Sequence, residues 1–381
     1  MRVLLVTNDF PPVLGGIQSY VRDYVDELVR REGPESVIVF AATPPHMSAS
    51  AWDRQQLYTV VRWPHRFLLP TPSAANAMAE LIRVHKIDTV WFGAAAPLAV
   101  LGQAARRAGA QRVVATTHGH EVGWSMLPGT RQMLQRIGQS ADVVSYISRF
   151  TLARLRPVFG SHPDYVALPS GVDTDFFHPV DESTRKRVRD QLGVADAPLI
   201  VCASRLVPRK GQDQLIRALP EIRRRIPGAR LVLVGSGHYG KKLRRLARGV
   251  EGVSFTGAVD RDTLRDIMAT ADVFAMPART RGRGLDLEGL GIVYLEAQAC
   301  AVPVVAGDSG GAPETVTDKT GVVIDGRDLS ALIGAVSTLL EDAALRHSMG
   351  QAGREHVSAN YSWEILGDRF RDVLQTQNPT V

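Results

Sequence analysis

Two glutamates, Glu288 and Glu296, lie in the segment RGRGLDLEGLGIVYLEAQA (281–299) with seven residues between them. A continuous helix would separate them by about 12 Å, because each residue adds about 1.5 Å along the axis. A retaining glycosidase holds its two carboxyl groups about 5 Å apart, and an inverting one about 6.5–9.5 Å. The apolar residues follow helical spacing only from about Gly291, so Glu288 is expected in a loop and Glu296 in the first helical turns. The pair suits hydrogen bonding to two sets of hydroxyls better than it suits an acid and a nucleophile flanking one bond.

The start of this helix is also a candidate anion site. The N–H groups of Leu290, Gly291 and Ile292 would be exposed at the helix N-terminus, where the helix dipole favours negative charge. A second candidate is SRLVPRKG, in which Arg205 leaves a strand and Lys210 precedes a helix. Two cations at this position could neutralise a diphosphate, and the alternative is a solvated loop with two ordinary charges.

Two further loops follow strands. In TNDFPPVLGGIQSY, Gly15 and Gly16 open a helix and would let a phosphate approach the backbone, although Gly-Gly at a helix start is often a simple turn. In VSFTGAV, the small residues before Val259 could let backbone groups meet a flat base, which is a weaker indication.

Two histidines, His118 and His120, follow a strand in THGHEVGW with Glu121 beside them. No further ligand converges on them at metal-binding spacing, so we expect no metal, and His118 fits substrate contact or proton transfer better. The Asp-Thr-Asp at 173–175 resembles a metal-binding motif but lies in a linker, where a turn and capping role is favoured.

The composition is that of a soluble globular protein. The chain has 381 residues, 45% hydrophobic and 22% charged, with a net charge of +6. The positive balance suits an anionic partner, but no aromatic-and-basic signature accompanies it, so no nucleic acid is expected. The cysteines Cys202 and Cys300 lie in apolar contexts and are expected as buried thiols. No segment matches a signal peptide or a membrane span, which predicts a cytoplasmic protein.

Short β-branched runs alternate with helical patterns in two series, which predicts two doubly wound α/β domains facing a cleft. We expect an N-terminal domain over 1–170, a linker over 171–184, a C-terminal domain over 185–361, and a final helix within 362–381 that could cross back to the first domain. The predicted strands are 2–7, 36–42, 88–94, 112–118 and 142–148, then 198–204, 229–237, 253–259, 272–278, 301–307 and 320–325.

The paired domains, the Gly-Gly loop, SRLVPRKG, FTGAV and EGLGIVYLEA together resemble the family 4 retaining glycosyltransferases of the GT-B fold. The last segment is similar to that family's Glu-x7-Glu motif, and the resemblance runs through essentially the whole chain. It implies a nucleotide-sugar donor in the second domain, an acceptor in the first, and no metal requirement.

The resemblance also implies roles for individual residues. Gly16 would approach the donor phosphate or the sugar, Arg205 and Lys210 would clamp the diphosphate, and Val259 would contact the base through its backbone. Glu288 would hold sugar hydroxyls, the backbone at Gly291 and Ile292 would meet the sugar and phosphates, and Glu296 would hold the ribose. His118 would lie beside the transferred sugar and the acceptor, with Asp9 a further acceptor candidate.

Within the family, the chain looks most like the actinobacterial GDP-mannose-dependent enzymes that add an α-1,6 mannose to phosphatidylinositol monomannoside. A lead-in, PARTRGRGLDLEGLG, supports this, and Arg279, Arg281 and Arg283 could meet an acceptor phosphate or be solvated. Another donor, a soluble acceptor, a nucleotide-sugar epimerase and a non-catalytic binding protein remain alternatives.

A phospholipid acceptor implies peripheral contact with the inner face of the plasma membrane. VVRWPHRFLLP (60–70) offers Trp63, Arg66 and Phe67 for an interfacial patch, and a buried connection is an equal alternative. The next helical segment, AANAMAELIRVHK, is not strongly basic, so the membrane-docking surface is left open.

Overall fold

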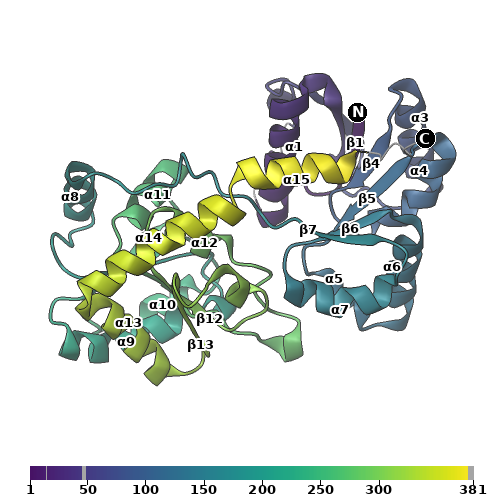
Figure 1. Ribbon diagram of the computed structural model, residues 1–381. Helices are drawn as coiled ribbons and strands as arrows, with labels where there is room; N and C mark the ends of the chain where they lie inside the picture. Colours follow the sequence, from purple (N-terminus) through teal and green to yellow (C-terminus); the bar gives the residue numbers. More distant parts are fainter. Residues whose placement is uncertain (14, 45–48, 376–381) are drawn as a thin grey trace. The chain divides into compact units, whose positions relative to one another are not determined.

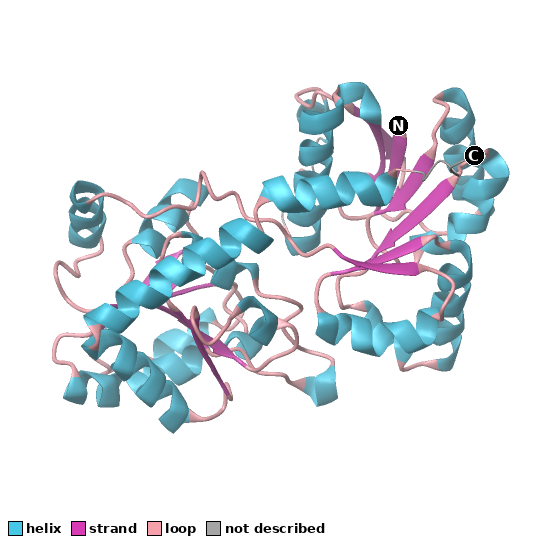
Figure 2. Ribbon diagram, viewed as in Figure 1, coloured by secondary structure: helices cyan, strands magenta, loops and turns pink. Residues whose placement is uncertain are grey.

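The computed structural model describes residues 1–13, 15–44 and 49–375, and the chain divides into two compact units (Figure 1). Unit 1 is Met1–Ser170 together with the segment that begins at Glu364, and unit 2 is Gly171–Trp363. Each unit is a parallel sheet with helices packed on its strands (Figure 2). The fold class is therefore the expected pair of Rossmann-like α/β domains.

Unit 1 contains a seven-stranded sheet in the order β3-β2-β1-β4-β5-β6-β7, with all neighbours parallel. Its strands are β1 (Val3–Thr7), β2 (Val37–Ala42), β3 (Thr59–Trp63), β4 (Thr89–Phe92), β5 (Arg112–Thr116), β6 (Val143–Tyr146) and β7 (Asp164–Ala167). The five strands expected in this half are present. The sequence reasoning missed β3 and β7, which form the two edges of the sheet, are only partly buried, and contain short apolar stretches beside charged residues.

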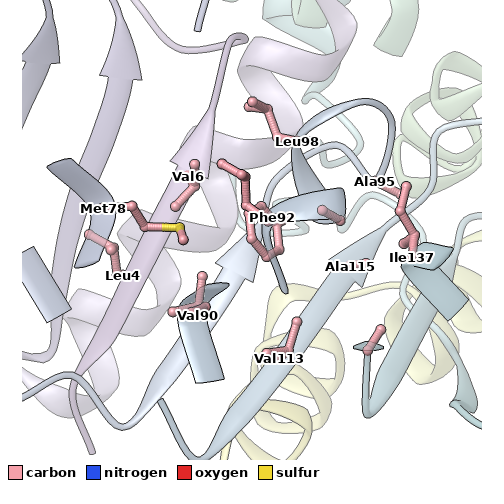
Figure 3. Packing of buried hydrophobic residues seen from close by; sticks show 14 of the residues in the cluster. Leu4, Val6, Met78, Val90, Phe92, Ala95, Leu98, Val113, Ala115 and Ile137 are labelled. Atoms are coloured by element: carbon pink, nitrogen blue, oxygen red, sulfur yellow. The ribbon is translucent and has the colours of Figure 1, made fainter. Parts of the chain in front are cut away.

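Within the described residues, seven helices of unit 1 precede unit 2 in the sequence, and an eighth follows it. They are α1 (Gly16–Glu32), α2 (Ala49–Asp53), α3 (Pro72–Val84), α4 (Gly102–Ala108), α5 (Glu121–Ser125), α6 (Pro128–Ser140), α7 (Arg149–Phe159) and, after unit 2, α15 (Trp363–Leu374), with 3-10 turns at η1 (Pro34–Ser36) and η2 (Leu98–Leu101). One core cluster lies between strands and helices, where Leu4 and Phe92 of the sheet pack near Met78 of α3 (Figure 3). This packing fixes the strand ends that carry the candidate site.

The last helix, α15, completes the core of unit 1. The Phe370 ring lies 4.7 Å from the rings of Tyr24 and Trp91, centroid to centroid, and is 1% exposed. The Thr89 hydroxyl donates to the carbonyl of Leu374 at 2.8 Å. Residues at the end of the chain therefore bury the aromatic surface of helix α1 and strand β4.

Unit 2 contains a six-stranded parallel sheet in the order β10-β9-β8-β11-β12-β13. Its strands are β8 (Leu199–Ala203), β9 (Arg230–Val234), β10 (Val253–Gly257), β11 (Val273–Met276), β12 (Val304–Gly307) and β13 (Gly321–Ile324), which are the six expected. Its helices are α8 (Glu182–Gln191), α9 (Gln212–Arg225), α10 (Gly240–Leu246), α11 (Arg261–Ala269), α12 (Ile292–Ala299), α13 (Leu329–Glu341) and α14 (Ala343–Asn360), with 3-10 turns at η3 (Pro208–Lys210), η4 (Gly282–Gly284) and η5 (Ala312–Thr315).

The segment expected as a linker is held by one hydrogen bond to a distant residue and by local turns. The N–H of Val172 donates to the carbonyl of Tyr361 at 2.7 Å. The Asp173 carboxylate accepts from the N–H of Phe176 at 2.9 Å, which is the turn role expected for the Asp-Thr-Asp. The Asp181 carboxylate accepts from the N–H of Thr184 at 2.7 Å and caps α8.

Strand order reverses once in each sheet, between β1 and β4 in unit 1 and between β8 and β11 in unit 2. Loops leave in opposite directions at such a point, so a crevice forms outside the carboxyl ends of the two strands. The loops after these four strands are where each unit offers room for a ligand. Within the described residues, no helix has the length and apolar character needed to cross a membrane.

We expect Phe370→Ala to destabilise unit 1 by about 3–5 kcal/mol, because it removes a fully buried ring and leaves a cavity. Phe67→Ala is the matched control, since that ring is 58% exposed and its loss should change the free energy of unfolding by no more than about 0.5 kcal/mol. Urea unfolding of both variants measures the difference. Equal midpoints would show that α15 does not support the unit 1 core.

Candidate active site

In unit 2, the reversal point is bridged by an ion pair between two expected site residues. Lys210 ends the 3-10 turn after β8, and Glu288 lies in the loop after β11. The Lys210 Nζ lies 2.7 Å from Glu288 Oε2, and both side chains are about nine-tenths buried. The resemblance assigns Lys210 to the diphosphate and Glu288 to the sugar of one donor, and the structure brings their charged groups into direct contact.

A third charge, which the sequence reasoning missed, adjoins this pair. The Nε of Arg209 lies 3.8 Å from Glu288 Oε2, and its Nη1 lies 3.4 Å from Asp286 Oδ1. The Glu288 oxygen is therefore shared by two cations, and with Asp286 the cluster holds two positive and two negative charges. The sequence signal that could have identified Arg209 is its position next to Lys210 in PRKG.

Arg205 differs from Lys210 in that its side chain is exposed at the end of β8, and no described residue forms an ion pair with it. Its backbone is held by Gln212 at the start of α9, whose Nε2 donates to the carbonyl of Arg205 at 3.0 Å and to Ser204 Oγ at 2.9 Å. The loop is therefore fixed while the guanidinium remains available. Gln212 was not singled out from the sequence, because a glutamine at a helix start carries no specific signal.

The loop that carries Glu288 is fixed by a glycine-rich turn after β12, GDSGG (307–311). The Glu288 N–H donates to Ser309 Oγ at 3.2 Å, and its carbonyl accepts from the N–H of Gly311 at 2.9 Å. A Cβ on Gly310, whose φ is +60°, would lie 2.0 Å from the Glu288 carbonyl oxygen, so this approach requires glycine. Ser309 and Gly310 were missed, although a glycine-rich turn at a strand end is a recognisable signal.

Helix α12 begins where the sequence predicts. Gly291 is the N-cap, with φ at +89°, and a Cβ there would lie 2.6 Å from Cε2 of Tyr294. Ile292 is the first helical residue, so the N–H groups expected for an anion lie at this turn. Glu296 follows one turn later, half-buried, and its charge adds to burial in raising the pKa of Cys300.

Val259 lies after β10 and is half-buried. It contributes to a cavity of 210 Å³ lined mainly by residues of α8 and α11. The expected backbone contact of Val259 with a base stays a prediction.

The structure corrects one expectation for the arginine-rich lead-in. Arg279 Nη2 lies 2.7 Å from Asp213 Oδ1, and this pair is nearly buried, so Arg279 anchors the lead-in to α9 and is not available to an acceptor phosphate. Arg281 is exposed, and its N–H donates to the carbonyl of Asp286 at 2.8 Å. The side chain of Arg283 lies outside the described residues.

In unit 1, Asp9 follows β1, and His118 follows β5, on either side of the reversal point. His118 Nε2 lies 2.7 Å from the carbonyl oxygen of Gly93, which follows β4. Burial lowers the pKa of His118, and the negative charge of Glu121 opposes that effect. Burial raises the pKa of Asp9, and the charges of His118 and His120 oppose that effect, so the three groups form one electrostatic cluster.

The backbone of this cluster is also held by carboxylate and amide contacts. Glu121 is fully buried, and its Oε2 accepts from the N–H groups of His118 at 3.1 Å and Gly119 at 3.0 Å. The Gln18 side chain donates to Asp9 Oδ1 at 2.8 Å. Gly16, the first residue of α1, is exposed with no atom within 4 Å of a Cβ built on it, so space for a ligand is present there.

The segment after β3 combines an anchored residue with exposed ones. Leu68 is buried, its N–H donates to Asn8 Oδ1 at 2.7 Å, and its carbonyl accepts from Asn8 Nδ2 at 2.9 Å. Arg66 and Phe67 on this segment line a 270 Å³ cavity together with Asp9. The structure therefore brings three acceptor candidates to one place.

Trp63 departs from the expected interfacial patch. Its ring packs edge-on against Phe40 with centroids 6.0 Å apart and joins the core cluster of unit 1. Since β3 is a strand and not a loose connection, the side chain of Trp63 is held against its neighbour strand, and the exposed apolar side chains of this segment are Phe67 and Leu69.

Both cysteines are buried, as expected, and burial raises the pKa of Cys202 and of Cys300 to about 12. Across the described residues, no group of three or more His, Cys, Asp or Glu side chains is arranged to hold a metal ion.

Comparisons with known proteins identify the family of this chain. The family model described as Glycosyltransferase Family 4 matches residues 14–176, and the model described as Glycosyl transferases group 1 matches residues 184–356. A Corynebacterium glutamicum protein named GDP-mannose-dependent monoacylated alpha-(1-6)-phosphatidylinositol monomannoside mannosyltransferase is 54% identical, over 99% of this chain and 98% of its own. The chain belongs to the group 1/family 4 glycosyltransferases.

Two further matches extend this result. The GDP-mannose-dependent alpha-(1-6)-phosphatidylinositol monomannoside mannosyltransferase of Mycolicibacterium smegmatis is 54% identical over 98% of each chain. The crystal structure of Anabaena HepE in complex with UDP has a TM-score of 0.80 at 21% identity, covering 98% of this chain and 99% of that one. At that identity the likeness concerns the fold, which is GT-B.

Removing one partner of the buried pair should destabilise unit 2. We expect Lys210→Ala to cost up to about 3 kcal/mol, the lower end of the range for breaking a buried ion pair, because Arg209 partly compensates the Glu288 charge. Arg205→Ala, at an exposed cation without an ion-pair partner among the described residues, should stay within about 0.5 kcal/mol. Urea unfolding monitored for unit 2 compares them.

The double variant Lys210→Met/Glu288→Leu separates charge from packing. It removes both buried charges together, so it should recover most of the stability lost in Lys210→Ala. If the double variant were less stable than the single one, packing around these side chains, and not the ion pair, would dominate.

Proposed function

We propose that this glycosyltransferase moves mannose from GDP-mannose to phosphatidylinositol monomannoside through an α-1,6 link, in the synthesis of phosphatidylinositol mannosides and lipoglycans. The observation that carries the proposal is the 54% identity, over nearly the full length of both chains, to relatives named for this reaction. The arrangement of charge at the two strand-reversal points supports it.

The donor is assigned to unit 2. Arg205 and Lys210 meet the diphosphate, and the N–H groups at Gly291 and Ile292 add the positive end of α12. Glu288 accepts hydrogen bonds from sugar hydroxyls through the carboxylate that also pairs with Lys210, so one contact relates the sugar to the phosphates. Glu296 binds the ribose hydroxyls, and the backbone at Val259 meets the base.

Transfer is proposed to proceed with retention of the anomeric configuration. The bond between the anomeric carbon and the phosphate oxygen breaks, and negative charge develops on the departing GDP, where Arg205 and Lys210 stabilise it. The acceptor hydroxyl attacks the same face, and its proton passes to the departing phosphate. These cations supply the charge stabilisation, so the proposal requires no metal ion or other cofactor.

The acceptor is assigned to unit 1. Asp9 accepts a hydrogen bond from an acceptor hydroxyl beside the 270 Å³ cavity, and His118 contacts the transferred sugar. Burial keeps His118 neutral near pH 7, so its ring can donate and accept hydrogen bonds without adding charge. Arg66 and Phe67 lie at the entrance for a phospholipid acceptor, which implies a peripheral protein at the cytoplasmic face of the membrane.

A donor-by-acceptor screen with mass detection tests the reaction. GDP-mannose with phosphatidylinositol monomannoside should give a product heavier by one hexose, and UDP-glucose or UDP-N-acetylglucosamine should give at least about tenfold less. Donor incubated alone should stay unchanged apart from slow hydrolysis. Isomerised nucleotide sugar in that incubation would instead indicate an epimerase.

Metal independence is a separate expectation. Treatment with EDTA should change the transfer rate by less than about twofold, because Arg205 and Lys210 carry out the charge neutralisation that a divalent cation performs in other sites. Arg205→Ala should lower kcat/KM by about 10²–10³, the usual effect of removing one donor to developing charge. Loss of activity on chelation, restored by Mg²⁺ or Mn²⁺, would contradict this assignment.

A further inference from the structure

Helix α10 carries a concentration of positive charge that the proposed reaction does not use. Five cations lie on or just after this helix, and between positions 238 and 250 the chain has no Asp or Glu. All five are exposed. They are Lys241, Lys242, Arg244, Arg245 and Arg248, which we call the α10 basic face.

The α10 basic face differs from the arginine cluster at the end of α9, in which every arginine lies near a glutamate. At the end of α9, Arg223 lies 2.6 Å from Glu251, and Arg224 lies 2.5 Å from Glu221, which Arg225 also approaches at 3.5 Å. None of the five cations of the α10 basic face forms an ion pair with a carboxylate in the described part of the chain. Their charge is therefore uncompensated within unit 2.

Packing fixes the direction of these charges. Leu243 is fully buried on the inner side of α10, against α9, so the flanking positions must point outward. The Lys242 ammonium lies 5.5 Å from the Tyr239 ring, and the Arg244 guanidinium lies 5.1 Å from the Phe255 ring. Figure 1 shows α10 on the side of unit 2 that also carries α9. The face is a fixed feature of the helix.

A cavity of 290 Å³ lies beside the face, between α9 and α10. Its lining combines apolar groups of Leu243 and Leu246 with the cations Arg217, Lys242 and Arg245. An apolar floor with a cationic rim suits an amphipathic group that carries a phosphate, such as the headgroup region of a phospholipid.

The α10 basic face is connected to the proposed donor loop. The N–H of Tyr239, the residue before α10, donates to the carbonyl of Leu206 at 3.1 Å, and the N–H of Leu206 donates to the carbonyl of Ser236 at 2.9 Å. Leu206 is the neighbour of Arg205. A surface bound at α10 therefore lies next to the strand end that carries the diphosphate clamp.

We propose that the α10 basic face docks this protein on an anionic lipid surface. The inference rests on the proposed lipid acceptor, which gives the protein a reason to reach a membrane. Five uncompensated cations on one face match the negative potential of such a surface. Nucleic acid fits less well, because the nearby rings of Tyr239 and Phe255 are covered by Lys242 and Arg244 and offer no stacking platform.

Vesicle binding tests the proposal without donor or acceptor present. Wild-type protein should co-sediment with phosphatidylglycerol vesicles at low salt, bind phosphatidylcholine vesicles far less, and be released by added salt. The variant Lys241→Gln/Arg245→Gln should lower the partition coefficient by about 25-fold, roughly fivefold for each cation near the surface. Neither residue belongs to the proposed active site, so transfer to an acceptor dispersed in detergent should be unchanged.

The matched control is Arg224→Gln/Arg225→Gln, which changes the net charge by the same amount at cations already paired with Glu221. It should bind the vesicles within about twofold of wild type. Equal losses in the two variants, or equal binding to both kinds of vesicle, would overturn the docking role. If the Lys241→Gln/Arg245→Gln variant lost binding to an RNA probe but bound vesicles like wild type, the docking role would be overturned in favour of nucleic acid.

The proposed reaction and the docking role fail in different ways. If wild-type protein bound anionic vesicles through α10 but transferred no mannose to the detergent-dispersed acceptor, the reaction would be wrong and the docking surface would stand. If it transferred mannose in detergent but bound no vesicles, the docking surface would be wrong and the reaction would stand.

Discussion

The parallel pairing of every strand is the constraint on which the site depends. Parallel strands deliver their carboxyl ends to one edge of a sheet, so each chemistry-bearing loop of a unit meets the others there. The reversal between β8 and β11 brings the Lys210 and Glu288 loops to one sheet edge, and the reversal between β1 and β4 does the same for the Asp9 and Gly93 loops. Both units place polar side chains in loops at the carboxyl ends of a parallel sheet. In unit 1 these side chains are a carboxylate and a histidine, and in unit 2 they are mostly cations.

The buried ion pair between Lys210 and Glu288 illustrates how such a site is held without a ligand. Two charges in a nearly closed environment are costly unless each neutralises the other, and the 2.7 Å contact does this. Arg209 approaches the same oxygen and also pairs with Asp286, so the charges of this cluster balance. The exposed Arg205 is the site cation that forms no ion pair with a described residue, and the turn at Ser309 keeps the Glu288 backbone in place. The cost of reorganisation on binding is thereby reduced.

Much of this arrangement could be read from the sequence, and the exceptions have physical causes. The inner strands and the start of α12 were predictable, because continuous apolar runs and a glycine before a helical pattern are local signals. The edge strands β3 and β7 were not, since half-exposed strands mix polar and apolar residues. Arg279 was misread because its partner, Asp213, is distant in sequence, and an ion pair between a loop and a distant helix leaves no local pattern. Trp63 was misread because it belongs to β3, and the half-exposed strand that holds its side chain was not predicted.

The path of the chain has a consequence for how the protein is made. Unit 1 begins at the first residue, yet the ring of Phe370 and the carbonyl of Leu374 belong to its core. During synthesis, the N-terminal sheet emerges from the ribosome long before α15 exists, while all of unit 2 is still to be translated. The aromatic surface around Trp91 therefore stays uncovered until α15 has been synthesised. Unit 1 can close its core only after every residue of unit 2 has been made.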